Sequence, residues 1–170
     1  MFDNESSDKC RCGKNDCVCE IVRKIAKVQA EAAGSDDCEV GCKESLRSLL
    51  SPAAALDNDT IPFILYCDCE PFIGQSVVQA TVGGNRVFQC LQSPVFRVSK
   101  VKDDCCAVLE ILLPVTEGGS TPASGGDDVC DFFPGNSIRN LRRTNVCITV
   151  DLCKFTGIAC LEPVNALPRA

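Results

Sequence analysis

The sequence contains no histidine and no tryptophan, and it has only one tyrosine, Tyr66. Without histidine the chain lacks the usual general base of hydrolases, the partner that activates serine or cysteine nucleophiles, and the commonest metal ligand. Conventional hydrolase chemistry is therefore disfavoured. We predict that the protein is not an enzyme and that it has no catalytic residues, no bound metal and no cofactor.

Long hydrophobic runs and basic clusters are also missing. The longest apolar stretches, residues 61–67 and 107–115, are far shorter than the roughly 20 residues that a membrane span requires. The net charge is −6 and the basic residues are scattered, which disfavours nucleic acid as a partner. The first eight residues are acidic and polar where a secretory signal would carry basic residues followed by an apolar run, so we expect no signal peptide.

What the chain does contain is 15 cysteines in 170 residues. Hydrophobic and charged residues occur at the levels of an ordinary globular protein, and a single domain of this length buries about 70% of its unfolded surface. The cysteines are therefore not needed to rescue a small scaffold. So many cysteines normally indicate disulfides in an oxidising compartment, yet nothing at the start of the chain directs it out of the cell. Either the thiols hold metal in the cytosol, or the protein is oxidised after its surroundings change.

Two helices are expected in the first third of the chain. Apolar residues recur at helical spacing over residues 16–33, and charged residues occupy the opposite face. Gly34 is the expected stop of this amphipathic helix. A shorter helix is expected over residues 43–50, ended by Pro52.

After residue 57 the sequence changes to short β-branched and aromatic runs separated by glycine, proline, asparagine and aspartate. Gly83-Gly84-Asn85 is typical of a tight hairpin turn, and the glycine-rich stretch 116–128 indicates a long loop or linker. The predicted strands cover residues 61–67, 77–82, 86–91, 95–101, 106–113, 146–153 and 157–161.

These elements predict an α+β fold that is mainly β: an antiparallel β-sandwich, jelly-roll-like or related, with an N-terminal amphipathic helix and a second short helix. An immunoglobulin-like sandwich and a barrel stay open as alternatives. We expect a flexible cysteine-rich arm at residues 1–15, helices within residues 16–55, a β body at residues 56–162 that forms one domain with the helices, and a tail at residues 163–170.

The cysteine spacing limits which pairs can bond. Cys10/Cys12, Cys17/Cys19 and Cys67/Cys69 are Cys-x-Cys pairs. In an extended chain such residues have Cα atoms about 6.6 Å apart, at the edge of what a disulfide spans, so each pair presents two thiols better than it bonds to itself. The adjacent Cys105 and Cys106 face opposite sides of a strand and need different partners. Because 15 is odd, one thiol stays free or bonds to another molecule.

Three other uses of the cysteines compete. Cys10, Cys12, Cys17 and Cys19 supply four thiolates for a zinc module, although zinc sites favour wider spacing. A thiol oxidoreductase is disfavoured because no Cys-x-x-Cys is present. Cysteines within apolar strands are also expected to act as buried small hydrophobes without a further role, and these are Cys90, Cys147 and Cys160.

A series of motifs in one order resembles the spore coat protein Y/Z family of bacilli, over roughly residues 10–162. The series is Cys17-Val18-Cys19 before the amphipathic helix, Cys38 and Cys42, Thr60-Ile61-Pro62-Phe63-Ile64-Leu65-Tyr66, Ser93-Pro94-Val95-Phe96-Arg97-Val98, Asp104-Cys105-Cys106-Ala107-Val108-Leu109, Val146-Cys147-Ile148-Thr149-Val150-Asp151-Leu152-Cys153, and Ile158-Ala159-Cys160-Leu161.

The resemblance implies a structural protein of the spore's outer coat or exosporium basal layer, made in the mother-cell cytoplasm. It implies ring oligomers, with a hexamer as the expected number, which form two-dimensional hexagonal arrays reinforced by disulfides. The implied partners are further copies of this chain and other coat or exosporium proteins. Oxidation after release from the mother cell would explain a cysteine-rich chain without a signal peptide.

On this hypothesis the cysteines divide into two groups. Those near the N-terminus are candidates for disulfides between subunits, and they are Cys10, Cys12, Cys17, Cys19, Cys38 and Cys42. Those in the β body are candidates for intrachain bonds or burial, and they are Cys67, Cys69, Cys90, Cys105, Cys106, Cys130, Cys147, Cys153 and Cys160. The alternative function is a cytosolic thiolate module that binds zinc.

Overall fold

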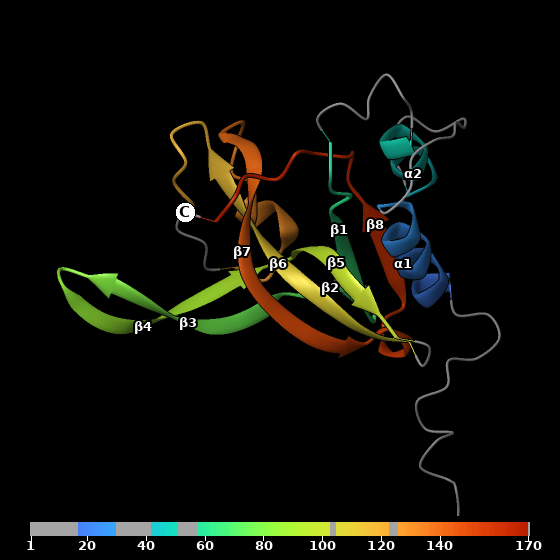
Figure 1. Cartoon of the computed structure of the whole chain (residues 1–170), viewed down its shortest axis with the longest axis horizontal. Helices are drawn as coiled ribbons and strands as arrows, with labels where there is room; N and C mark the ends of the chain where they lie inside the picture. The colour runs from blue at the N-terminus through green and yellow to red at the C-terminus, as the bar shows by residue number, and fades with distance from the viewer. Residues whose placement is uncertain (1–16, 30–41, 51–57, 103–104, 123–125, 170) are drawn as a thin grey trace, which may run out of the picture.

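The computed structural model describes residues 17–29, 42–50, 58–102, 105–122 and 126–169. Two α-helices precede the strands, and two short 3-10 helices lie immediately before and after the region of strand β7 (Figure 1). The elements are α1 (Cys17–Val28), α2 (Cys42–Leu50), β1 (Phe63–Cys67), β2 (Glu70–Pro71), β3 (Gly74–Val82), β4 (Asn85–Ser93), β5 (Val95–Val101), β6 (Cys106–Thr116), η3 (Val129–Phe132), β7 (Ile138–Asp151), η4 (Leu152–Lys154) and β8 (Gly157–Cys160).

Helix α1 forms where the apolar spacing predicts it. Val18, Val22 and Ile25 lie one or two turns apart and are buried, whereas the charged residues of the helix face away from the core. Glu20 in the first turn and Lys27 in the last complement the helix dipole. The predicted helix is confirmed over residues 17–28, and α2 begins one residue before the predicted 43–50. Position 16, residues 30–33 and the expected stop at Gly34 lie outside the described residues.

The main sheet has six antiparallel strands. Its order is β2-β1-β5-β6-β7, and β8 also pairs with β1. The longest pairing joins β6 to β7, from Cys106 opposite Asp151 to Thr116 opposite Ile138. This pairing contains two register shifts, one of them between Glu110 and Leu112. Extra residues in β7 at that shift bend the strand and re-aim its side chains.

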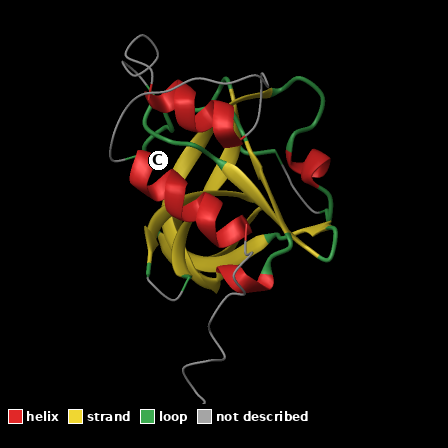
Figure 2. Cartoon of the chain, turned by 90° about the vertical axis from the view of Figure 1, so that its right-hand side faces the viewer, coloured by secondary structure: helices red, strands yellow, loops and turns green. Residues whose placement is uncertain are grey.

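Both faces of the main sheet are covered. The helices lie on one face, in front of the strands in Figure 2, where they enclose the larger apolar core around Phe63, Phe96 and Leu109. A second apolar cluster, with Ile64, Leu112 and residues near η3, covers part of the sheet away from that core. The sheet therefore has a packed interior on each side, as a stable domain requires.

Residues 163–169 are hydrogen-bonded to the body, which differs from the tail expected there. The backbone N–H of Val164 donates to the carbonyl oxygen of Thr60 at 2.9 Å, and that of Leu167 donates to Leu141 at 2.9 Å. Ala166 between them is buried. The segment is held in place because Val164 pairs with Thr60, just before β1, and Leu167 pairs with Arg142 in β7. The sequence of the segment itself does not predict these contacts.

Strands β3 and β4 form a hairpin that projects from the body, at the left of Figure 1. All nine residues of each strand pair without a register shift. Gly83 and Gly84 in the turn have φ values of 58° and 82°, which suit glycine and match the twist of a two-residue hairpin. The predicted turn is confirmed.

The expectation of an α+β, mainly β fold with antiparallel strands is confirmed. The two sheets differ greatly in size, because the second contains only β3 and β4 among the described residues. Helices therefore cover one face of the main sheet where a sandwich would place a second large sheet. Two strand segments were not predicted: the two-residue β2, and the first half of β7, where the arginines hide the strand pattern.

Gly74, at the foot of the hairpin, is placed where a side chain does not fit. A Cβ atom on it would collide with the ring of Phe96, which is fully buried. We expect Gly74→Ala to lower the free energy of unfolding by about 1 to 3 kcal/mol, as overpacking does, and thermal unfolding measures this. Gly118→Ala is the control, because nothing lies within 4 Å of its added Cβ. Equal stability of the two variants would contradict the close approach.

Candidate cross-linking sites

Two disulfides tie the helices to the sheet. Cys19, on the buried face of α1, bonds to Cys105 just before β6, with Cα atoms 5.8 Å apart. Cys42, at the start of α2, bonds to Cys160 at the end of β8, with Cα atoms 4.7 Å apart. Both distances lie in the usual range for disulfides. Each bond joins segments that are distant in sequence, so each restrains the whole fold.

These pairings differ from the expected use of Cys19 and Cys42 between subunits. Cys19 points into the core because helix α1 buries the face on which it lies, and Cys42 faces β8 because α2 packs there. Their partners Cys105 and Cys160 were among the candidates for intrachain bonds or burial. Cys153 is also disulfide-bonded. The remaining expected intersubunit cysteines fall outside the description: Cys10, Cys12, Cys38 and the side chain of Cys17.

Several cysteines of the β body lie at the surface, which differs from the burial expected for them. Cysteines of the body that form no disulfide include Cys67, Cys69, Cys90, Cys130 and Cys147. All except the half-buried Cys67 are exposed, and Cys106 is half-buried. Cys90 is exposed because its strand belongs to the projecting hairpin, where no second layer covers its face. Its apolar neighbours in sequence gave no sign of this.

Two of these thiols have a raised pKa. Burial raises the pKa of the Cys147 thiol, and the nearby carboxylate of Glu110 raises it further, against the opposing effect of Arg143. Burial and then Asp68 raise the pKa of the Cys67 thiol. Since the thiolate is the nucleophile in disulfide exchange, these two cysteines react more slowly near neutral pH. Cys67 and Cys147 are therefore the poorer candidates for bonds to other molecules, and the exposed thiols of Cys69, Cys90 and Cys130 stay candidates.

These three thiols lie on separate elements. Cys69 is in the turn between β1 and β2, with a left-handed φ of 68°. Cys90 is on the hairpin strand β4, and Cys130 is in η3. A body with thiols on three different elements has the means to form covalent links to more than one neighbour.

An ion pair with a buried carboxylate, which sequence reasoning missed, lies near Cys147. The guanidinium of Arg143 donates from Nη2 to Glu110 Oε1 at 2.8 Å and from Nε to Oε2 at 3.1 Å. The backbone N–H of Asn145 donates to the same carboxylate at 3.3 Å. Burial alone would raise the pKa of Glu110, but these hydrogen bonds and the charges of Arg143 and Arg97 outweigh it, so the pKa lies below its usual value.

The ion pair depends on the irregular pairing of β6 with β7. Asn145 has a left-handed φ of 56° at the register shift, and this brings Arg143 and its neighbours over Glu110. The only indication of this ion pair in the sequence is a single glutamate, Glu110, within an otherwise apolar strand. Its partner is 33 residues away, so the pattern around Glu110 alone does not identify it.

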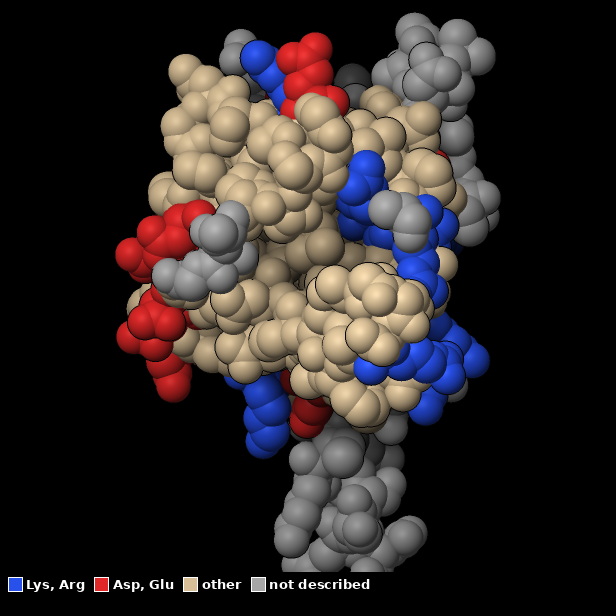
Figure 3. All heavy atoms as spheres, turned by 90° about the vertical axis from the view of Figure 1, so that its left-hand side faces the viewer, with Lys and Arg blue, Asp and Glu red and all other residues tan. Residues whose placement is uncertain are grey.

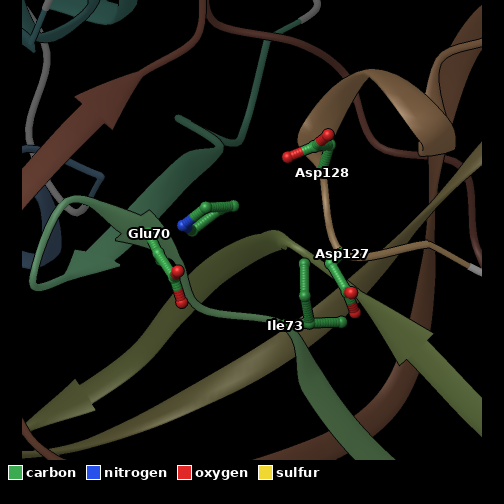
Figure 4. A pocket seen from close by; sticks show the side chains of 5 residues that line it. Glu70, Ile73, Asp127 and Asp128 are labelled. Carbon is green, nitrogen blue, oxygen red and sulfur yellow. The ribbon is translucent and has the colours of Figure 1, made fainter.

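A second polar feature is an acidic pocket at the foot of the hairpin, with a volume of about 260 Å³. Glu70, Asp127 and Asp128 line it together with Pro71 and Ile73, which immediately precedes β3 (Figure 4). The carboxylates come from β2 and from the segment before η3. Within the described parts of the chain, no group of three or more cysteine or acidic residues is arranged to hold a metal ion.

In this structure Cys19 is bonded to Cys105, so one of the four thiolates that the zinc hypothesis requires is not available to a metal.

The charged residues of the surface are unevenly distributed. Figure 3 views the molecule from the side on which the hairpin projects. It shows a group of lysine and arginine side chains at the right and a group of aspartate and glutamate side chains at the left, with charges of both signs at the top and bottom. No helix among the described residues is long and apolar enough to cross a membrane.

Comparison with known proteins identifies relatives of the whole body. The model of the family described as spore coat protein Z matches residues 5–163. The chain is 33% identical over 149 residues to the spore coat protein Z of Bacillus subtilis (strain 168), a match that covers 86% of this chain and 89% of that protein. No solved structure matches the chain.

Proposed function

Because this chain belongs to the spore coat protein Z family, we propose that it is a building block of the spore's outer coat or exosporium basal layer that assembles with copies of itself. The family assignment makes it a structural protein of the spore coat. The finer proposal is that ring-shaped homo-oligomers, with six subunits as the expected number, extend into two-dimensional arrays and are then cross-linked by disulfides. Catalysis forms no part of this role.

The observation that carries the cross-linking proposal is the division of the cysteines. Cys19, Cys42, Cys105 and Cys160 are used inside the chain, which leaves a disulfide-braced body. Exposed thiols remain on the β1–β2 turn, on the hairpin and in η3. Because the body is held by its internal disulfides, the exposed thiols stay apart on separate elements. They therefore form new disulfides most easily with neighbouring subunits. Cys10, Cys12, Cys17 and Cys38 remain candidates for such bonds.

The order of events follows from the chemistry of thiols. A reducing cytoplasm keeps exposed thiols free, so subunits first associate through non-covalent contacts. After the mother cell has lysed, molecular oxygen accepts two electrons and two protons from each pair of facing thiols and becomes hydrogen peroxide, while the two sulfurs bond. A ring that grows into an array needs two kinds of contact, one cyclic and one that joins rings.

Negative-stain electron microscopy of the purified chain tests this proposal. We expect rings, sheets or tubes of regular repeat, which resist heating until a strong reductant is added. Loss of order only under combined reductant and heat would mean that disulfides reinforce contacts that already exist. Discrete monomers in every sample would contradict self-assembly, and stoichiometric zinc in such monomers would favour the metal-binding alternative.

A further inference from the structure

The β3–β4 hairpin carries all the large hydrophobic side chains that are strongly exposed among the described residues. They are Val77, 61% exposed, Val82, 52%, and Phe88, 73%. Val77 lies opposite Cys90 and Gln79 opposite Phe88, so Val77, Phe88 and Cys90 share one face of the hairpin. These three residues form the hairpin patch. No layer of the described body covers it.

The hairpin also lacks the features that keep edge strands apart. Its 20 residues, 74–93, contain one charged residue, Arg86, whereas 24% of the whole chain is charged. Natural edge strands usually carry charges, proline or bulges, and this hairpin has none of the last two. Among the described residues, β3 and β4 pair only with each other. A hairpin of two strands is marginally stable alone, so a surface built in this way calls for a partner.

The charge distribution favours a second copy of this chain as that partner. The chain has a net charge of −6, so two copies repel each other over most of their surface. The hairpin contains no carboxylate, and its single cation, Arg86, lies next to the turn at its tip. The acidic pocket with Glu70, Asp127 and Asp128 lies at its foot. Two hairpins lying side by side in opposite directions bring each cationic tip toward the acidic foot of the other.

The position of Cys90 fits the same arrangement. Gln89 is the middle residue of the nine in β4, so Cys90 is one residue from the centre. When two identical strands pair antiparallel about a two-fold axis, only the residue on the axis lies opposite its own copy, so the register required here places the axis at Cys90. Cα atoms directly opposite each other in such a pair are about 4.5 to 5.5 Å apart, which lies within the range for a disulfide.

We propose that the β3–β4 hairpins of two copies pair antiparallel about a two-fold axis, β4 beside β4, to form a four-stranded sheet with Cys90 next to its own copy. The pairing joins the two hairpin patches into one apolar surface and occupies the open edge of β4. It supplies the contact that links rings into an array, and to that extent it rests on the proposed function.

Cysteine cross-linking with oxidised glutathione tests the geometry. The two Cys90 thiols give up two electrons and two protons, the disulfide of glutathione accepts them to become two thiols, and a Cys90–Cys90 bond forms. Mass spectrometry of the peptides identifies the bonded pair. We expect Cys90–Cys90 links at least about tenfold more abundant than Cys130–Cys130 links, although both thiols are exposed. Equal yields, or no Cys90–Cys90 link, would overturn the proposal.

A charge placed in the hairpin patch tests the non-covalent contact. We expect Phe88→Glu to weaken hairpin pairing by about tenfold or more, since it removes one aromatic anchor from each copy and places a charged carboxylate from each copy in the joined apolar surface. Electron microscopy should then show isolated rings without arrays. Thr149→Glu is the matched control, because it adds the same charge at an exposed position on β7. It should leave the arrays intact.

The outcomes separate this inference from the proposed function. Arrays in both Phe88→Glu and the original chain would overturn the hairpin contact and leave self-assembly standing. Absence of any rings or arrays from the original chain, with Cys90–Cys90 dimers still formed, would overturn array formation and support the hairpin contact. Arrays lost equally in Phe88→Glu and Thr149→Glu would show a general charge effect and would also overturn the proposal.

Discussion

Replacing both Cys42 and Cys160 with alanine is expected to lower the free energy of unfolding by about 4 to 5 kcal/mol. The two cysteines are 118 residues apart in sequence, and a disulfide that closes a loop of this length removes much of the conformational entropy of the unfolded chain. For a chain of this size the loss corresponds to a decrease of about 8 to 20 °C in the midpoint of thermal unfolding. Circular dichroism at increasing temperature measures it.

The double substitution should also release helix α2 before the sheet unfolds. The helix has nine residues, too few to be stable by itself in water. Besides the disulfide, the hydroxyl of Ser45 donates a hydrogen bond to the carbonyl oxygen of Leu161, which lies beside β8. We expect amide hydrogens of α2 to exchange with solvent faster than those of β5 and β6.

Cys130→Ala is the control for this experiment, because Cys130 is exposed and in no disulfide. Its midpoint of unfolding should stay within about 2 °C of the original chain, as surface substitutions usually do. A double variant of Cys42 and Cys160 that unfolds at the same temperature as Cys130→Ala would show that the bond contributes nothing to the stability of the body.

The elements that the sequence predicts correctly are those set by local spacing. The buried positions of α1 follow from the recurrence of Val18, Val22 and Ile25, and the hairpin turn follows from two adjacent glycines. Strand β5 has the predicted bounds because its apolar run lies between proline and a charged turn. In each case the signal lies within a few residues of the feature.

The elements that were missed depend on contacts between distant segments. The first half of β7 contains Arg142 and Arg143, which suit a strand only because one of them meets Glu110 across the sheet. The pairing of Cys19 with Cys105 depends on where α1 docks. The strand pattern around Cys90 is correct, yet its exposure depends on the absence of a covering layer. Periodicity indicates which residues share a face, and tertiary structure decides whether that face is buried.

Arg143→Met is expected to destabilise the fold by about 3 kcal/mol near neutral pH, because it leaves the Glu110 carboxylate buried without its partner. The Glu110 side chain is 3% exposed, whereas that of Arg143 is 37% exposed, so the unpaired charge would be the inaccessible one. A loss of this size corresponds to a decrease of about 6 to 12 °C in the midpoint of unfolding. Arg139→Met, an exposed position on the same strand, is the control.

The dependence on pH distinguishes a lost ion pair from lost packing. In the original chain the pKa of Glu110 is lower in the folded state than its usual value of about 4.3. Its contribution is therefore fully present above that value and is lost as the pH falls through the folded pKa. In Arg143→Met, burial should instead raise the folded pKa of Glu110 above the usual value. Protonation then favours the folded variant, so the difference in stability between the two proteins should shrink as the pH falls from 7 toward 4. A difference that stays constant over this range would indicate that Arg143 acts through the packing of its aliphatic portion. The double variant Glu110→Gln, Arg143→Met provides a second test at pH 7. It should recover most of the stability lost in Arg143→Met only if the unpaired charge of Glu110 causes that loss.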